Sequence, residues 1–128
     1  MILAIHIKEE GGYKGVFASR DIDKGLVLCD LTHGWLVKEP TRTSIQNSET
    51  IHVEHEIGGC INHSCHPSCR ISSFFVVALR DIKEGEEITF DYNKNEDVIA
   101  SPFECNCCGK MILGRKHEQE RTKSNILQ

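Results

Sequence analysis

Two polar stretches decide the fold of this chain: residues 61–69, INHSCHPSC, and residues 85–92, GEEITFDY. The first stretch, read by itself, is open to three interpretations. Its histidines and cysteines suit a metal site, its asparagine and serines around a proline suit a tight loop, and its neighbouring thiols and imidazoles suit a nucleophilic pair. The second stretch is a glycine turn followed by a strand that ends at Tyr92. Considered in isolation, Tyr92 is readily explained as an aromatic side chain that packs on the core.

A third cluster, residues 103–114, reads FECNCCGKMILG and brings three cysteines within four residues. This density predicts a zinc site for which Cys65 is the natural fourth ligand, and a cysteine-rich turn without metal is the alternative. The chain has seven cysteines, an odd number that cannot pair completely. Because its first residues do not read as a signal peptide, the cysteines indicate thiols or metal ligands rather than disulfides.

Outward from these clusters, short apolar runs separated by turn residues predict a mainly β protein. No stretch before residue 110 keeps a 3.6-residue apolar repeat over three turns. The charged residues 115–124 are expected to form a terminal helix or to stay disordered. The expected strands are 2–7, 15–18, 26–29, 34–37, 51–53, 74–79 and 87–90.

The sequence also contains an internal echo. Residues 16–25 read VFASRDIDKG, and residues 76–85 read VVALRDIKEG. Each copy runs from an apolar strand through Arg-Asp-Ile to a glycine, Gly25 or Gly85, that suits a turn with positive φ. The echo is either chance reuse of a good hairpin sequence or the mark of two related β-units packed together, and the second interpretation favours a β-rich core.

Length and charge bound the class of protein. At 128 residues the chain has room for one core. Its net charge of −4 argues against general nucleic-acid binding and is compatible with a basic protein partner. The apolar start, residues 1–7, is too short to span a membrane. The sequence thus predicts a cytoplasmic protein without membrane association, although export to a host by a non-Sec route would leave no such signal.

Taken together and in this order, the clusters resemble the SET domain of protein-lysine methyltransferases. That family has a glycine-rich turn leading into V-F-A, then N-H-S-C-x-P-N, then a strand like G-E-E-L-T-F-D-Y, and often a post-SET cysteine segment. The resemblance covers about residues 3–117, and residues 43–46, TSIQ, resemble the short insert of minimal bacterial and viral members. The matching positions here are 15–18, 62–68, 85–92 and 105–108.

The chain departs from the family pattern at four places. The usual G-x-G spacing is not kept in residues 12–15, GYKG. The aromatic and basic residues that often precede N-H-S-C are replaced by residues 59–61, GCI. Ser68 stands where the motif ends in asparagine, and the post-SET cysteines are compressed to C-x-C-C.

The resemblance implies a mainly β fold, the SET-domain β-clip of small curved sheets with a C-terminal pseudoknot. It divides the chain into a SET domain, residues 1–100, a post-SET-like cysteine segment, residues 101–117, and a charged tail, residues 118–128. It implies an S-adenosylmethionine-dependent protein-lysine N-methyltransferase acting on a basic protein such as a histone or ribosomal protein. The rivals are a catalytically inactive SET-like module that binds peptide or cofactor, and a plain structural zinc protein.

The resemblance also assigns roles to residues. Tyr92 is the expected catalytic group, and it orients a lysine amine that an apolar channel and the sulfonium keep neutral. The expected cofactor contacts are the Lys14-Gly15 backbone, the Asn62 side chain, the His63 backbone, the Tyr92 hydroxyl and the Phe103 ring. The expected lysine channel is formed by Phe90, Ile45, Gln46, Phe74 and Phe75, and one structural zinc is expected on Cys65, Cys105, Cys107 and Cys108.

Phe90 carries a further expectation, because the family has either phenylalanine or tyrosine at this position. A tyrosine there anchors a water that crowds a methylated amine, whereas Phe90 leaves room and implies di- or trimethylation. The short insert between Lys38 and Ile57 offers little surface for choosing a substrate. That leaves room for a partner protein or a homodimer to supply the rest.

Overall fold

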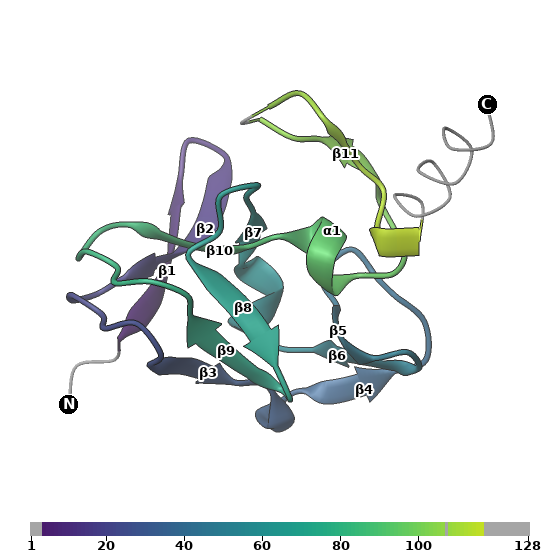
Figure 1. Ribbon diagram of the computed structural model, residues 1–128, viewed down its shortest axis with the longest axis horizontal. Helices are drawn as coiled ribbons and strands as arrows, with labels where there is room; N and C mark the ends of the chain where they lie inside the picture. Colours follow the sequence, from purple (N-terminus) through teal and green to yellow (C-terminus); the bar gives the residue numbers. More distant parts are fainter. Residues whose placement is uncertain (1–3, 107, 117–128) are drawn as a thin grey trace.

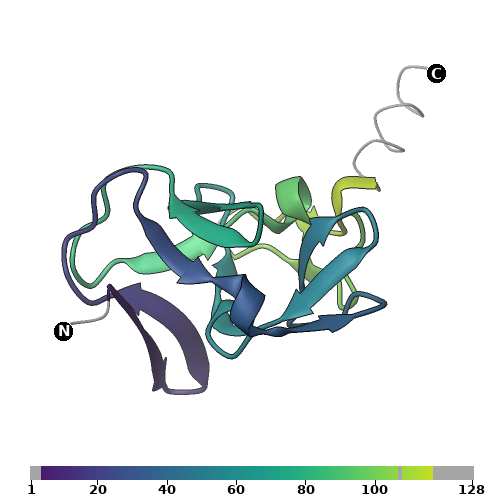
Figure 2. The same ribbon diagram turned by 90° about the horizontal axis from the view of Figure 1, so that it is seen from below.

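The computed structural model describes residues 4–106 and 108–116. The described chain is built of short strands in small sheets that spread along the long axis of the molecule (Figures 1 and 2). This confirms the predicted mainly β fold. The strands are β1 Ile5–Glu10, β2 Tyr13–Ala18, β3 Val27–Asp30, β4 Trp35–Val37, β5 Ile45–Ser48, β6 Ile51–Glu54, β7 Asn62–His63, β8 Cys69–Ser72, β9 Phe75–Ala78, β10 Glu87–Phe90, β11 Phe103–Glu104 and β12 Met111–Ile112. The helix α1 spans Tyr92–Asn95, and 3-10 turns span Leu31–His33 and Gly58–Cys60.

Among the described residues the strands form four sheets. Their orders are β1-β2-β10-β7, β3-β9-β8, β4-β6-β5 and the hairpin β11-β12. The β1-β2 hairpin and the β4-β6-β5 sheet lie at opposite ends of the molecule in both views (Figures 1 and 2). All pairs are antiparallel except β10 with β7, which run parallel. That parallel pair joins the two stretches that decide the fold.

The core lies between the three larger sheets. Val16 of β2, Val76 of β9 and Ile88 of β10 are each fully buried, and the 3-10 turn adds Leu31. Burial alternates along β9, FVVA, whereas in β10, EITF, the three residues after Glu87 are all buried. Strands that the sequence did not predict, such as β7 and β8, are two to four residues long.

The two echoing segments pack against each other with matched hydrogen bonds. Ile22 and Ile82 form an isolated antiparallel bridge, in which each backbone N–H donates to the other's carbonyl at 2.8 Å. Gly25 N–H donates to Ala78 O and Gly85 N–H donates to Ala18 O, both at 2.9 Å. Both glycines have φ near +90°, as the turn requires. This confirms that the two echoing segments pack together.

The last described segment folds back on the body of the domain. The N–H of Gly114 donates to the Asn93 side chain, and a Cβ at Gly114 would lie 2.5 Å from Asp97 O, so only glycine fits this approach. Of the expected terminal helix, residues 115 and 116 are described and the rest lies outside the described residues. The pseudoknot stays a prediction. No helix in the described part of the chain is long and apolar enough to cross a membrane.

Candidate functional site

The parallel pairing of β7 with β10 brings the two polar stretches together. Its register places Asn62 opposite Thr89 and His63 opposite Phe90. Tyr92 follows two residues after Phe90, where Asp91 caps α1 by accepting a hydrogen bond from the N–H of Asn93 at 3.0 Å. Asp91 therefore fixes the end of the strand, and the Tyr92 side chain begins at the same edge as His63.

Ser68, which stands in place of the family's asparagine, links the loop after β7 to β10 by hydrogen bonds. It is fully buried, and its hydroxyl donates to Glu87 O at 3.2 Å. Its side chain and that of Thr89 also exchange hydrogen bonds with each other's backbone N–H groups, at 3.0 and 3.2 Å. Buried polar groups whose hydrogen bonds are all made specify one strand register. Ser68, although it differs from the family's asparagine, therefore keeps the loop attached to β10.

A cavity of about 730 Å³ opens over this edge, within the range of small-molecule and cofactor sites. Six residues predicted for the cofactor or the lysine channel line it: Ile45, Asn62, His63, Phe90, Tyr92 and Phe103. Within the described chain, five other predicted residues are not part of its lining: Lys14, Gly15, Gln46, Phe74 and Phe75.

Lys14 and Gly15 nevertheless contact side chains that line the cavity. The Lys14 carbonyl accepts a hydrogen bond from Asn62 Nδ2 at 2.8 Å. A Cβ added to Gly15 would lie 2.7 Å from Glu87 Oε2 and 3.1 Å from Asn62 Nδ2. The turn without the usual G-x-G spacing therefore still holds Asn62, and a side chain at Gly15 would have to displace the side chains of Glu87 and Asn62.

Gln46, Phe74 and Phe75 occupy other places. Gln46 is 3% exposed, and its side chain donates to Asp97 Oδ2 at 2.8 Å and accepts from the Asp97 N–H at 2.6 Å. Phe74 lies in the turn between β8 and β9 with φ of 72° and packs on the core. Phe75 begins β9 and is exposed. Gln46 thus ties β5 to Asp97, and Phe74 contributes to the core.

Tyr92 is held in one orientation by an aromatic cluster and one strong hydrogen bond. Its hydroxyl donates to Ile61 O at 2.5 Å. Its ring centroid lies 4.7 Å from that of Phe90 and 5.9 Å from that of Phe103. Burial, followed by the nearby carboxylates of Glu96 and Glu87, raises the pKa of Tyr92 far above its usual value. The phenol is therefore neutral, and its oxygen lone pairs can accept hydrogen bonds.

Sequence reasoning missed a carboxylate beside Asn62. Both oxygens of Glu87 lie 2.7 Å from the Tyr13 hydroxyl, and Oε2 accepts from Asn62 Nδ2 at 2.9 Å. Burial, followed by this carboxylate, raises the pKa of Tyr13. Nothing in the sequence marked the pair, because Tyr13 and Glu87 are far apart in the chain. The carboxylate gives this end of the cavity a negative charge.

Glu96 is a second carboxylate that the sequence did not mark. It is 5% exposed, lines the cavity, and accepts from the N–H of Gln46 at 2.9 Å and from Asn95 Nδ2 at 2.6 Å. Burial raises its pKa to about 7, against the lowering effect of those two hydrogen bonds and of Arg115. Glu96 therefore titrates near neutral pH while attached to β5.

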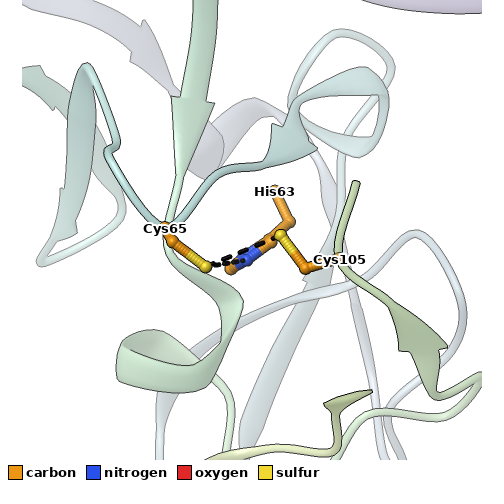
Figure 3. Close-up of side chains that lie close together, drawn as sticks. All are labelled: His63, Cys65 and Cys105. Carbon is orange, nitrogen blue, oxygen red and sulfur yellow. Dashed lines mark hydrogen bonds between the residues drawn. The ribbon is translucent and has the colours of Figure 1, made fainter. Parts of the chain in front are cut away.

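The cysteines predicted as metal ligands converge. Cys65 Sγ lies 3.6 Å from Cys105 Sγ and 3.4 Å from Cys108 Sγ, and Cys107 lies outside the described residues. A tetrahedral zinc with bonds of about 2.3 Å places its sulfurs about 3.8 Å apart, so these separations are compatible with zinc. His63, Cys65 and Cys105 point toward one another, and their ligand atoms lie within 4.8 Å (Figure 3).

The geometry does not favour the thiol-nucleophile interpretation of residues 61–69. Cys69 is 1% exposed, and burial raises the pKa of its thiol to about 11, so it stays protonated. Cys65, in turn, belongs to the cluster of sulfurs. The His63 ring is buried, and this burial lowers the pKa of the imidazole despite the Asp91 carboxylate 3.7 Å away. The ring is therefore neutral at pH 7.

Comparisons with known proteins agree with this geometry. The sequence model of the SET domain matches residues 13–93. The variant-silencing SET domain-containing protein of Plasmodium falciparum is 32% identical over 98% of this chain and 6% of its own length. Methyltransferase flvH of Aspergillus flavus is 32% identical over 80% of this chain and 61% of its own length. A histone-lysine N-methyltransferase, H3 lysine-36 specific, of Schizosaccharomyces pombe is 36% identical over 48% of this chain and 9% of its own length.

The chain thus spans less than two thirds of each of these three relatives. The matched region contains β2, β7 and β10, and the cavity-lining residues from Glu96 to Asn106 lie beyond it. It ends just beyond Tyr92 and leaves the cysteine segment outside the match. The small sheets, the ordered motifs and the matched region lead to one conclusion, that the chain belongs to the SET domain family.

Proposed function

We propose that this chain is an S-adenosylmethionine-dependent protein-lysine N-methyltransferase domain. The observation that carries the proposal is the β7–β10 pairing, which sets Asn62 and His63 beside Phe90 and Tyr92 at one cavity. The names of the Aspergillus flavus and Schizosaccharomyces pombe relatives, a methyltransferase and a histone-lysine N-methyltransferase, support it. The chain's negative charge favours a basic protein substrate such as a histone or ribosomal protein.

The residues around the cavity fit the cofactor. Phe103 offers an aromatic face for an adenine ring, and the Glu87 carboxylate offers a partner for an ammonium group. Asn62 Oδ1 is available as an acceptor, because the hydrogen bonds of this side chain run through Nδ2. When bound, S-adenosylmethionine supplies the methyl group from a sulfonium that leaves as a thioether.

The chain's own residues position the substrate amine. The Tyr92 hydroxyl donates its hydrogen bond to Ile61 O. Its oxygen lone pairs therefore remain free to accept from the amine N–H or to make weak C–H contacts. Because the pKa of Tyr92 is raised, the hydroxyl orients the amine and does not act as a base. Phe90 is 3% exposed and gives the channel an apolar wall, which favours the neutral amine that attack requires.

We also propose that Cys65, Cys105, Cys107 and Cys108 hold one structural zinc. Cys65 Sγ lies 3.6 and 3.4 Å from the sulfurs of Cys105 and Cys108, and Cys65 belongs to the same loop as Asn62 and His63. A metal here would fasten the hairpin β11-β12, and with it Phe103, to that loop. Elemental analysis of protein purified without a metal-affinity tag tests this, and zinc content near zero would reject it.

The proposal of activity is tested by incubating the protein with labelled S-adenosylmethionine and a panel of histones and ribosomal proteins. Mass spectrometry then locates the labelled lysine. Tyr92→Phe is the matched variant, because it removes one hydroxyl and keeps the aromatic cluster. We expect its rate to fall by about 10²-fold or more, the scale for loss of one preorganised group.

Two results would contradict the proposal. One is a Tyr92→Phe rate within twofold of the unmodified protein. The other is an absence of labelled lysine while calorimetry shows cofactor binding, which would identify an inactive module that binds cofactor.

A further inference from the structure

His63 lies between the cysteine cluster and Tyr92. Its Nε2 is 3.4 Å from Cys65 Sγ, and its Nδ1 is 3.0 Å from the backbone nitrogen of Tyr92. Its ring centroid lies 5.3 Å from that of Tyr92 and 5.9 Å from that of Phe103. Its side chain is 2% exposed. One buried ring thus touches the metal site and the residue expected to orient the substrate.

The Tyr92 contact fixes which ring nitrogen carries the proton. A backbone N–H can only donate, so Nδ1 must present its lone pair to Tyr92. In a neutral imidazole the proton is then on Nε2, which faces the Cys65 sulfur. A nitrogen that carries a proton cannot bind a metal, so its nearness to Cys65 and Cys105 does not make His63 a ligand.

The opposite arrangement is unfavourable. If Nε2 bound the metal, a neutral ring would carry its proton on Nδ1, and two N–H groups would face each other at 3.0 Å. The Asp91 carboxylate, 3.7 Å from Nδ1, is too distant for a normal hydrogen bond that would compensate. The Tyr92 amide would also be left buried without an acceptor, at a cost of about 1–3 kcal/mol.

We propose that His63 is a positioning residue that couples the metal centre to Tyr92: Nε2–H donates to the Cys65 thiolate while Nδ1 accepts from the Tyr92 backbone. The inference rests on the proposed zinc site. Hydrogen bonds to metal-bound ligands fix their orientation and strengthen metal binding. Zinc occupancy then holds the His63 ring, and the ring holds the residue at which α1 begins.

The proton position is measured directly on the zinc-loaded chain with ¹⁵N-labelled histidine. Long-range proton–nitrogen correlation spectra should show His63 protonated at Nε2, with its signals assigned by their loss in a His63→Gln variant. After ¹¹³Cd replaces zinc, no scalar coupling should connect the metal to a His63 nitrogen. Protonation at Nδ1, or a metal–nitrogen coupling, would overturn the inference.

Two variants divide the roles of the ring. His63→Gln can place an amide N–H near the Nε2 position, and His63→Asn can place a carbonyl near the Nδ1 position. We expect His63→Asn to lose zinc to a chelator about 10–100-fold faster, the scale for removing a partner of a metal ligand. His63→Gln should stay within about threefold of the unmodified protein and instead expose the Tyr92 amide to hydrogen exchange. His33→Asn, at an exposed histidine that pairs with Asp30, is the control.

The outcomes separate this inference from the proposed activity. Equal zinc loss in both His63 variants, or faster loss in His63→Gln, would overturn the coupling. Zinc content near zero in the unmodified protein would also overturn it. A chain that binds zinc, shows Nε2–H and transfers no methyl group would support the coupling and contradict only the proposed activity. If His63→Gln fails to fold, the loss of signals in His63→Asn assigns His63, and the spectra of the unmodified protein then decide the matter.

Discussion

Phe90 sits where a single hydroxyl would alter the shape of the proposed lysine channel. Its side chain is 3% exposed, lines the cavity and lies against the Tyr92 ring. No polar atom on Phe90 can anchor a water near the amine, and an ordered water contributes about 0–2 kcal/mol. Because each 1.4 kcal/mol is about tenfold in a rate ratio, this one position can decide how many methyl groups are added.

We therefore predict di- or trimethylation by the unmodified protein and a shift toward monomethylation in Phe90→Tyr. The first transfer should remain nearly as fast in the variant, because the hydroxyl affects a methylated amine more than an unmethylated one. A mass-spectrometric time course on a peptide substrate, with enzyme in excess, measures both. Phe75→Tyr is the matched control, since Phe75 is exposed and lies outside the cavity lining. An unmodified protein that stops at one methyl would contradict the prediction.

The sequence indicates a role in the site for some of these residues and gives no signal for others. Asn62, His63 and Tyr92 stand out because their motifs occur in a fixed order, and the parallel strand pair makes them neighbours. Tyr13 and Glu87 carry no such signal, since only the fold brings them together. The family resemblance implies a place for Phe74 in the channel, but the structure has it in a turn with positive φ, a conformation that the residue type does not predict for phenylalanine.

At the scale of elements, Glu96 joins the end of α1 to β5. Its carboxylate accepts from the Gln46 backbone and lies beside Asp97, which pairs with Arg115 at 2.6 Å. Burial raises the pKa of Glu96 to about 7 from 4.5. The folded state therefore holds the proton more tightly than the unfolded state does. Stability from this group is present at low pH and is lost as pH rises from about 4.5 through about 7.

We predict that Glu96→Gln removes this pH dependence. A shift of this size corresponds to roughly 3 kcal/mol of unfolding free energy at most. The variant should be more stable than the unmodified protein above about pH 7 and similar to it near pH 5. Urea unfolding at a series of pH values measures this. Asp97→Asn is the comparison, because the pKa of Asp97 is lowered and its loss should destabilise at neutral pH. A Glu96→Gln protein with an unchanged pH profile would show that Glu96 titrates normally.

Strands are easiest to predict where the sequence offers an apolar run or an alternating pattern between turns. β9, FVVA, is an apolar run and β10, EITF, alternates apolar with polar residues, and the sequence predicts both to within one residue. β5, IQNS, and β7, Asn62–His63, are polar and short, so their strand conformation comes from tertiary partners. The cysteine hairpin was expected as a metal segment, and β11 and β12 inside it had no pattern to reveal them.

At the scale of the whole molecule, the bridge between Ile22 and Ile82 joins two halves of the core. Both side chains are 1% exposed. We predict that Ile22→Ala and Ile82→Ala each cost about 2–5 kcal/mol of unfolding free energy, the range for buried isoleucine truncation. Because the two residues face each other, the double variant should cost less than the sum. Urea unfolding measures all three, and Leu79→Ala, at a partly exposed position, should cost far less. Full additivity would show that the halves are energetically independent.

The matched bonds between the echoing segments extend beyond this bridge. Lys24 N–H donates to Asp81 Oδ1, and Glu84 N–H donates to Asp21 Oδ1, both at 2.9 Å. Each echoing segment thus donates to the other the same hydrogen bonds that it accepts from it. This is the arrangement expected when two copies of one short peptide meet about a twofold axis. Within this single chain, the two segments therefore contact each other as two identical peptides would across the interface of a symmetric dimer.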